Sequence, residues 1–346
     1  MEHTQSPRRI ALVMAAASAV LLATACSSDS SDEPDAVNLE PVTRVDSPDT
    51  AVPPIGVVTD SPSGLHSTTF DADTRSVVAL SDDLMSLVVF TAPDGQIADQ
   101  PPREISLPGA AAGIADAGDG RLLLPMDRSL VEVDLRTSDI DSIPIDANLT
   151  SAARLDDGRF AAGDDGGTIH VVDPDGDRSQ VETVGGLTSV DALASTQYGV
   201  TALDRHQTSL TEVKVDDGSL GLALRAGEGA AHLDTDRFGR ILVTDTVGRE
   251  LLVYSSEDLL LRQRFPVDAQ PWAVAYDDKS DVVWISLPGD NEVVGYTLDT
   301  GIPVEVARFP TVRQPDSIAV DSDTGDLFVG SATGNGLQRI SVAEGR

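Results

Sequence analysis

The sequence contains a single cysteine, Cys26, among 346 residues. One thiol excludes a disulfide framework and any zinc site built from several cysteines. Aromatic residues make up only 4% of the chain, which excludes extensive stacking surfaces for bases or sugars. Basic residues are also scarce, because 24 Lys and Arg stand against 57 Asp and Glu, a formal net charge of -33. Such a charge repels phosphate groups, so we expect no nucleic acid among the partners.

The N-terminus carries the pattern of an export signal. Arg8 and Arg9 precede an apolar run over residues 10–25, shorter than the about 20 residues that a membrane-spanning helix needs. The run ends in the letters LATAC at 22–26, and small residues before a cysteine resemble a bacterial lipobox. The resemblance implies a signal peptide over 1–25, lipidation of Cys26 and a lipid-anchored protein on the extracytoplasmic face of the cell membrane. An ordinary secretory signal with a chance cysteine is the alternative.

Residues 26–52 are rich in Ser, Asp, Glu and Pro and show no hydrophobic periodicity. Such a segment repels itself and buries little apolar surface, so we expect a flexible acidic tether between the lipid and the folded part. Lysine occurs only at Lys214 and Lys279, whereas Ala, Asp and Arg are frequent. This usage is typical of a GC-rich genome and indicates an actinobacterium.

The remainder, residues 53–346, repeats one pattern of strands and turns. With 40% hydrophobic residues the chain can build a large core. Central strands begin at Val77, Leu122, Phe160, Val200, Ile241, Val282 and Leu327. Asp and Gly fill the turn before most of them, as tight hairpins require. A repeat of roughly 40 residues with about four strands per copy is typical of β-propeller blades.

The two ends of the repeat region predict how the ring closes. The last copy stops at Arg346 without its outer strand, and a spare strand at 55–59 precedes the first copy. We expect this spare strand to complete the last blade, because closure removes two open sheet edges. The predicted fold is therefore all-β, a seven-bladed propeller of four-stranded antiparallel blades.

Two copies carry a resemblance to known repeats. The letters VVWI at 282–285 with NEVVGY at 291–296, and LFVG at 327–330 with NG at 335–336, are similar to YVTN/NHL-type (YncE-like) propeller repeats. The resemblance covers most of the chain after the signal. It implies extracytoplasmic binding and scaffold proteins, although relatives of these repeats include lactonases, lyases and redox enzymes, so the fold leaves the function open.

Ligands of propellers bind near the central channel, and the loops after the central strands carry an acid in six of the seven copies. One interpretation is a ring of carboxylates that binds Ca²⁺, another divalent ion or a basic peptide. The other, which we favour, is that each aspartate caps its own hairpin turn. The candidate contacts at the channel mouth are His66, Asp127, Asp164, His206, His232, Asp245 and Asn291.

The sequence offers no complete catalytic set. No serine lies in a Gly-x-Ser-x-Gly elbow, and Cys26 is assigned to the lipid, so nucleophilic catalysis has no support. Calcium-dependent lactonases of the gluconolactonase type use Glu, two Asn and Asp, for which Asn148 and Asn291 are available, but the typical Asn-Asp-Gly motif is absent. His206 and His232 belong to neighbouring blades, and a metal or acid/base site between them stays open. We predict no catalytic residue and no cofactor.

Two functions remain open on these grounds. The first is a monomeric envelope lipoprotein whose propeller binds or scaffolds a protein, a peptide or a small ligand. The second is a metal-dependent hydrolase or lyase, similar to the lactonases, with its site at the channel mouth. A channel lined by convergent polar groups suits either of them.

Overall fold

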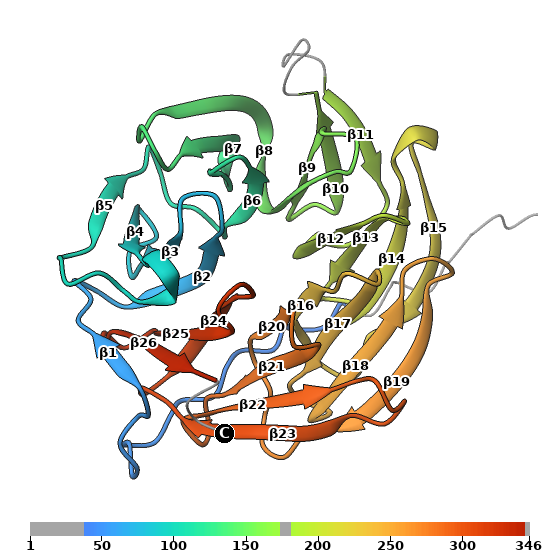
Figure 1. Ribbon diagram of the computed structural model, residues 1–346. Coiled ribbons are helices and arrows are strands. Elements are labelled where there is room, and N and C mark those ends of the chain that lie inside the picture. Colours follow the sequence, from blue (N-terminus) through green and yellow to red (C-terminus); the bar gives the residue numbers. More distant parts are fainter. Residues whose placement is uncertain (1–37, 174–180, 343–346) are drawn as a thin grey trace, which may run out of the picture. The chain divides into compact units, whose positions relative to one another are not determined.

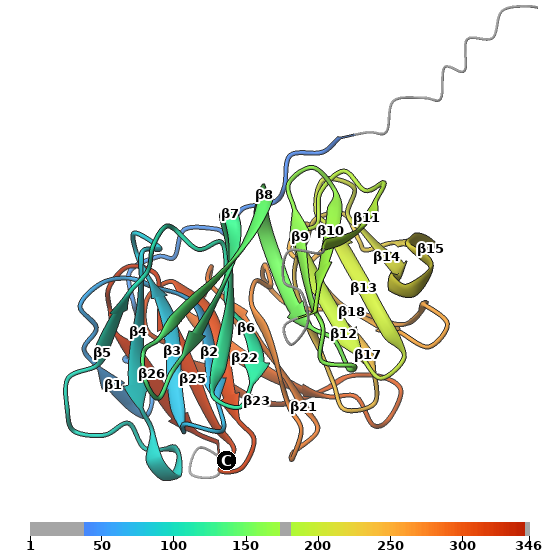
Figure 2. The same ribbon diagram turned by 90° about the horizontal axis from the view of Figure 1, so that it is seen from above.

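A computed structural model describes residues 38–173 and 181–342 (Figure 1). In this part the chain is almost entirely antiparallel β-sheet, arranged as a ring around a central channel, and is therefore a β-propeller (Figures 1 and 2). The two helices found there are single 3₁₀ turns, η1 (Pro93–Gly95) and η2 (Val215–Asp217). None of the described helices is long and apolar enough to cross a membrane. The expected signal peptide, Cys26 and the start of the tether lie outside the described residues.

Five sheets of the ring have four strands each. The first comprises β2 (Leu65–Asp71), β3 (Ser76–Ser81), β4 (Ser86–Thr91) and β5 (Arg103–Ser106). Two more comprise β12 (Ala192–Thr196), β13 (Gly199–Asp204), β14 (Ser209–Lys214) and β15 (Ser219–Arg225), and β16 (Ala230–Thr235), β17 (Arg240–Asp245), β18 (Glu250–Ser255) and β19 (Leu260–Pro266). The others comprise β20 (Val274–Asp277), β21 (Val282–Leu287), β22 (Glu292–Thr297) and β23 (Val304–Pro310), and β24 (Pro315–Asp321), β25 (Asp326–Ser331), β26 (Leu337–Ser341) and β1 (Val57–Thr59).

The sixth sheet corrects the expectation of seven separate four-stranded blades. It has six strands, β6 (Ala115–Gly118), β7 (Arg121–Asp134), β8 (Ile140–Arg154), β9 (Phe160–Asp164), β10 (Thr168–Val172) and β11 (Val181–Gly185), so the hydrogen-bonded sheets number six. The second and third sequence copies share this sheet. They are joined because β8 pairs with β7 through its first half and with β9 through its second half, without a break between them.

The short strand ahead of the first copy belongs to the last sheet. β1 pairs with β26 in antiparallel fashion, with Val57 opposite Arg339 and Thr59 opposite Leu337. The Gln338 side chain extends the join, because its Nε2 donates to the carbonyl oxygen of Ile55 at 2.7 Å. Strands from both ends of the described chain therefore share one sheet, and they cover an edge that would otherwise be open.

The core lies between the faces of neighbouring sheets. The central strands β3, β21 and β25 are buried at every position, because both of their faces pack against other sheets. The outer strands, such as β15 and β19, are mostly exposed. Trp284 is one of the largest fully buried side chains. Its ring packs directly against Gly295, where a Cβ atom would come within 2.7 Å of the ring. A glycine opposite Trp284 is therefore required by the packing.

The described part of the expected tether lies against the propeller. Residues 38–52, which we call the strap, belong to the same compact unit as the propeller and lie along one of its faces (Figure 2). The backbone N–H of Leu39 donates to the carbonyl oxygen of His206 at 2.9 Å, and Ser47 is buried. The strap is polar, but loops of the propeller satisfy its backbone groups, so it is ordered without needing an apolar periodicity.

Candidate functional site

Four of the strands that line the channel carry a β-bulge. The register shifts between His66 and Thr69 in β2 and between Leu149 and Ser151 in β8. The same happens between Ala230 and Leu233 in β16, and at Asp316 in β24. A bulge bends its strand and redirects side chains, and bulges are frequent beside functional sites. Here the bulges place polar side chains at one end of the channel.

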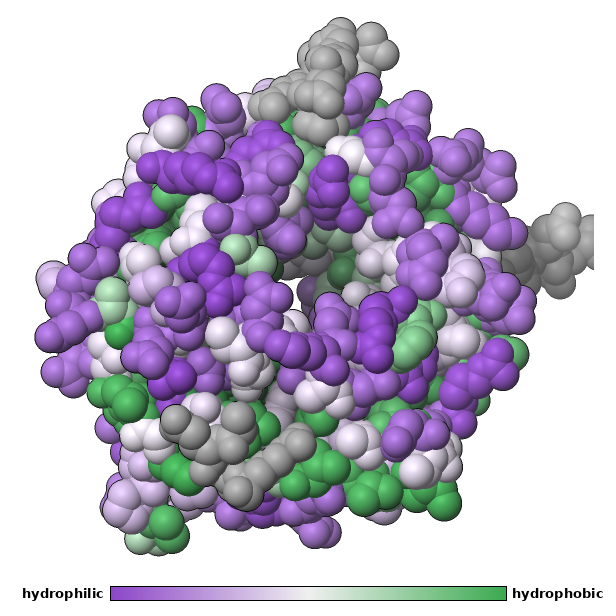
Figure 3. Space-filling model, viewed as in Figure 1, coloured by the Kyte–Doolittle hydropathy of each residue, from purple (hydrophilic) through white to green (hydrophobic). Residues whose placement is uncertain are grey.

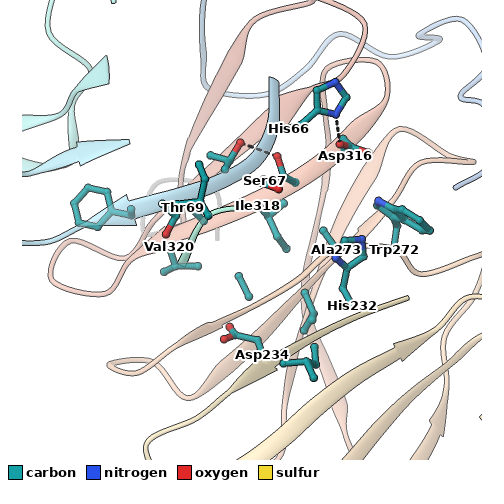
Figure 4. A pocket seen from close by; sticks show the side chains of 18 of the residues that line it. His66, Ser67, Thr69, His232, Asp234, Trp272, Ala273, Asp316, Ile318 and Val320 are labelled. Carbon is teal, nitrogen blue, oxygen red and sulfur yellow. Dashed lines mark hydrogen bonds and ion pairs between the residues drawn. The ribbon is translucent and has the colours of Figure 1, made fainter. Parts of the chain in front are cut away.

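The channel contains two neighbouring cavities, of about 560 Å³ and about 500 Å³. Both are lined by Ser67, Ala112, Ile114, His232, Leu233 and Asp234, so they are two lobes of one space. The larger lobe also has Arg44, His66, Trp272 and Asp316 in its wall, whereas the smaller has Thr150, Asp191 and Arg205. Figure 4 shows part of the larger lobe, and the face in Figure 3 is hollowed at its centre.

A charged cluster lies at the strap end of the larger lobe, between the first and last sheets. His66 donates from Nδ1 to Asp316 Oδ2 at 2.7 Å, as Figure 4 shows, and Arg44 of the strap forms an ion pair with Asp316 Oδ1 at 2.9 Å. The hydrogen bond to Asp316 raises the pKa of His66 although burial opposes it. Burial alone would raise the pKa of Asp316, but His66 and Arg44 outweigh it and hold that pKa below its ordinary value. Both groups therefore favour their charged forms in mildly acidic solution.

His232 is held differently, against an aromatic ring. Its imidazole meets the Trp272 ring edge-on, with centroids 4.7 Å apart (Figure 4). Burial, with a smaller effect from the charge of Arg205, lowers the pKa of His232 to about 4, so the imidazole is neutral at pH 7. Its Nε2 is buried and has no hydrogen-bond partner among the described residues. An unsatisfied buried donor or acceptor of this kind is costly in a folded protein.

Asp234, on the same strand as His232, faces the channel from within the protein. It accepts hydrogen bonds from the backbone N–H groups of Thr235 and Tyr276, both at 2.8 Å. Asp234 is half-buried and lines both lobes of the channel. Burial raises the pKa of Asp234 to about 7, against the effect of the two hydrogen bonds. A carboxyl group that titrates near neutral pH thus lines both lobes.

The strap crosses the loops around this mouth. The guanidinium of Arg205 donates to the carbonyl oxygen of Val42. Further along, the Ser47 hydroxyl donates to the carbonyl oxygen of Pro288 at 2.6 Å, and its backbone N–H donates to Gln314 Oε1 at 2.9 Å. Because Arg44 lies between these anchors, the strap delivers a charged side chain to the wall of the channel.

Two of the seven predicted contacts, His66 and His232, line the channel. Two others hold the strap: His206 Nδ1 lies 3.0 Å from the carbonyl oxygen of Leu39, and Asn291 Nδ2 donates to that of Pro48 at 3.0 Å. His206 and Asn291 therefore contact the strap, and neither is among the residues that line the two lobes.

The three predicted aspartates do not converge on the channel. Asp245 is fully buried and accepts backbone N–H groups of Glu228, Gly229 and Gly248 at 2.8–2.9 Å. Asp164 accepts those of Gly166 and Thr168 at 2.9 and 2.8 Å. Asp127 is exposed, at a bend of β7. Asp164 and Asp245 therefore cap turns, the role that the sequence analysis favoured for the acids after the central strands.

The described residues contain no group of three or more His, Cys, Asp or Glu side chains arranged to hold a metal ion. The aspartates of the loops after the central strands accept hydrogen bonds from backbone N–H groups instead. Asp204, for example, accepts those of Thr188 and Gln207, both at 2.9 Å. These hydrogen bonds explain why an acidic residue follows most central strands, because its carboxylate bonds both to its own hairpin turn and to the loop that enters the sheet.

Five residues described in the site were missing from the predicted set: Arg44, Arg205, Asp234, Trp272 and Asp316. Arg44 was placed in a flexible tether, and the bulge that carries Asp316 has no sequence signal of its own. Trp272 had a signal, because the chain contains only two tryptophans and a half-polar ring at a strand entrance often marks a binding surface. Arg205 stood in the same loop as the predicted His206, one position earlier.

Comparisons with known proteins support the fold. No protein-family model matches the chain, and no curated protein matches it. The chain is similar to hydrazine synthase of Kuenenia stuttgartiensis, with 15% identity and a TM-score of 0.67 over 83% of this chain and 97% of that one. It is also similar to U3-55K, with 12% identity and a TM-score of 0.68 over 83% of this chain and 98% of that one. At these identities the likeness extends to the fold: the chain is a β-propeller with antiparallel blades.

Proposed function

We propose that the protein is an envelope lipoprotein of an actinobacterium and that its propeller is a YVTN/NHL-type binding domain whose channel receives a small ligand or the end of a peptide. Propellers commonly serve as binding or scaffold domains, and the site lies where such ligands bind. Cys26, with its lipobox-like surroundings, would hold the protein on the membrane.

One observation carries this proposal. At one end of a channel with two lobes of about 560 and 500 Å³, polar groups from separate sheets converge on the same space, and one of them, His232 Nε2, has no partner in the described chain. The wall around them also carries apolar side chains, with Ile114, Leu233 and Ile318 beside Trp272. Ligand sites in proteins combine hydrophobic and aromatic side chains with convergent polar groups in this way.

At the mouth that it crosses, the strap favours a small occupant over a large one. Arg44 and Val42 lie across the loops at the mouth, and Arg205 and Asp316 hold them there. A folded protein domain that approached this face would meet the strap before the channel. A compound of modest size, or an extended peptide end, fits the two lobes that remain.

The ligand site is tested by blocking the channel. Ala112 is exposed and lines both lobes, so Ala112→Phe narrows the space without disturbing the core. We expect ligand-observed NMR with a library of small compounds to detect binders that compete with one another and that Ala112→Phe abolishes. Ala98→Phe, at a site outside the cavity walls, is the matched control. Binders that are unaffected by Ala112→Phe would contradict a channel site.

Lipidation is tested separately at Cys26. We expect a fatty-acid label to enter the wild-type protein in an actinobacterial host and to be absent from Cys26→Ser. The variant protein should leave the membrane fraction. Equal labelling of the two proteins would overturn the lipoprotein assignment and leave the channel site unaffected.

A further inference from the structure

Arg205 is an arginine without a carboxylate partner in the wall of the smaller lobe. It is half-buried, and its guanidinium donates to the carbonyl oxygen of Val42, while its Nε is buried with no hydrogen-bond partner in the described chain. Within 4 Å of this guanidinium there is no Asp or Glu oxygen of the described residues. Asp191 is nearby, but its Oδ2 accepts the backbone N–H of Arg205 at 2.7 Å instead.

Several other arginines of the propeller have carboxylate partners. Arg75 is paired with Asp321, and Arg339 lies 2.9 Å from Asp326. With 57 acidic residues against 24 basic ones, carboxylate partners are plentiful in this chain. A buried guanidinium that lacks one in such a protein has an unmet capacity to bind an anion.

Trp272 brings Arg205 and His232 to the same place. The guanidinium carbon of Arg205 lies 5.9 Å from the centroid of the Trp272 ring, and the His232 imidazole meets that ring from another side at 4.7 Å. Both Arg205 and His232 line the smaller lobe, and His232 extends into the larger one. Two buried nitrogens without partners, Arg205 Nε and His232 Nε2, thus border one cavity beside an aromatic surface.

We propose that Arg205 and His232 form a subsite for the carboxylate of an organic monoacid, whose apolar body lies along Trp272 and the channel wall. This inference rests on the proposed ligand site in the channel and names the class of ligand. Arg205 supplies the charge, and His232 supplies one hydrogen bond from a neutral ring.

The surrounding charges favour a monoanion over a phosphate. Asp191 and Asp234 share the smaller lobe with the subsite, and Asp316 lies in the wall of the larger one. A dianion would be repelled by these carboxyl groups and would be offered one positive charge. A carboxylate carries a single charge, which one guanidinium balances.

Matched pairs of acid and amide test the subsite on the full chain. We expect benzoate to bind at least about tenfold more tightly than benzamide, and hexanoate than hexanamide, by ligand-observed NMR and calorimetry, since a charge-assisted hydrogen bond contributes an effect of this size. Arg205→Gln should abolish the preference for the acid, while Arg205→Lys should retain part of it. Arg249→Gln, an exposed arginine on the same side of the ring, should leave it unchanged.

Because Arg205 also donates to the strap, a second variant that leaves this contact intact is needed. His232→Phe keeps an aromatic ring against Trp272 and removes Nε2, so it should weaken benzoate several-fold while the affinity of benzamide stays the same. Urea unfolding of each variant separates loss of the subsite from loss of the fold.

The outcomes separate the two proposals. Equal affinity for acid and amide, lost together in Ala112→Phe, would overturn the carboxylate subsite and support the channel site. Tighter binding of inorganic phosphate than of benzoate would overturn the choice of a monoacid. If benzoate and hexanoate fail to bind at all, the subsite is refuted. If the library too contains no compound sensitive to Ala112→Phe, the channel site itself fails.

Discussion

Replacing Ser47 by alanine tests whether the strap is part of the folded propeller. The Ser47 hydroxyl donates to the carbonyl oxygen of Pro288 at 2.6 Å and accepts the backbone N–H of Gln314 at 3.0 Å. Its side chain is only 4% exposed, so water cannot replace these bonds directly. Each lost hydrogen bond of a buried hydroxyl costs about 1 kcal/mol.

The partners of Ser47 keep some of their bonding, which limits the effect. The carbonyl oxygen of Pro288 also accepts the N–H of Asn291 at 3.3 Å, and the N–H of Gln314 also donates to Asn291 Oδ1 at 3.1 Å. We therefore expect Ser47→Ala to lower the free energy of unfolding by about 1–2 kcal/mol, rather than by the larger amount that fully orphaned groups would cost.

Urea unfolding followed by circular dichroism measures this change, and Thr43→Ala is the control within the strap. Thr43 is exposed and has no side-chain hydrogen bond in the described chain, so its replacement should change the free energy of unfolding by less than about 0.5 kcal/mol. Limited proteolysis should cut the strap faster in Ser47→Ala than in Thr43→Ala. If both variants unfold with the wild-type midpoint, the strap is not held as the structure has it.

Three further predictions concern the caps, the pH dependence and metal ions. Asp245→Asn leaves one acceptor oxygen for three backbone N–H groups and should lower the free energy of unfolding by about 2–3 kcal/mol. A decrease of less than about 1 kcal/mol, measured by urea unfolding, would contradict the role of Asp245 as a cap. Because the pKa of His66 is raised in the folded protein, its contribution to stability is complete below pH 6.5 and is lost as the pH rises, and His66→Asn should remove this dependence. Because the pKa of His232 is lowered to about 4, the folded protein loses stability as the pH falls below 6.5, and His232→Phe should remove that dependence. Unfolding curves at several pH values measure both effects. The melting temperature should be the same in EDTA as with Ca²⁺, Mn²⁺ or Zn²⁺, and a saturable shift with one ion would support the hydrolase alternative.

The repeats were predictable because their signals are local. Each of the seven central strands named from the sequence lies in a buried strand, from Val77 in β3 to Leu327 in β25, since β-branched runs between Asp/Gly turns need no distant partner to be recognised. The grouping into sheets was not predictable in the same way. β7 runs through the loop expected at Asp127, and β8 pairs with strands of two successive copies; only the pairing of whole strands decides whether two copies share a sheet.

The site was predictable only in part, for a physical reason. His66 and His232 were identified by residue type, but their partners come from elsewhere in the chain: Asp316 lies 250 residues after His66 in the sequence. The bulges that turn these side chains into the channel depend on register, which a single sequence does not reveal. Asp164 and Asp245 were listed as candidate ligand contacts because a carboxylate in a turn suits a ligand contact as well as a cap.

The strap also determines from which side the channel is reached. Its anchors at Val42, Ser47 and Pro48 are hydrogen-bonded to loops of the propeller, and Arg44 is paired with Asp316, so opening this mouth requires several bonds to break together. The opposite face carries no such segment among the described residues and is hollowed at its centre (Figure 3). A ligand would therefore enter past Asp234 and reach the polar groups beneath the strap last. If entry follows this route, pinning the strap by a cross-link should leave the rate of ligand binding unchanged, and a bulky residue near Asp234 should slow it.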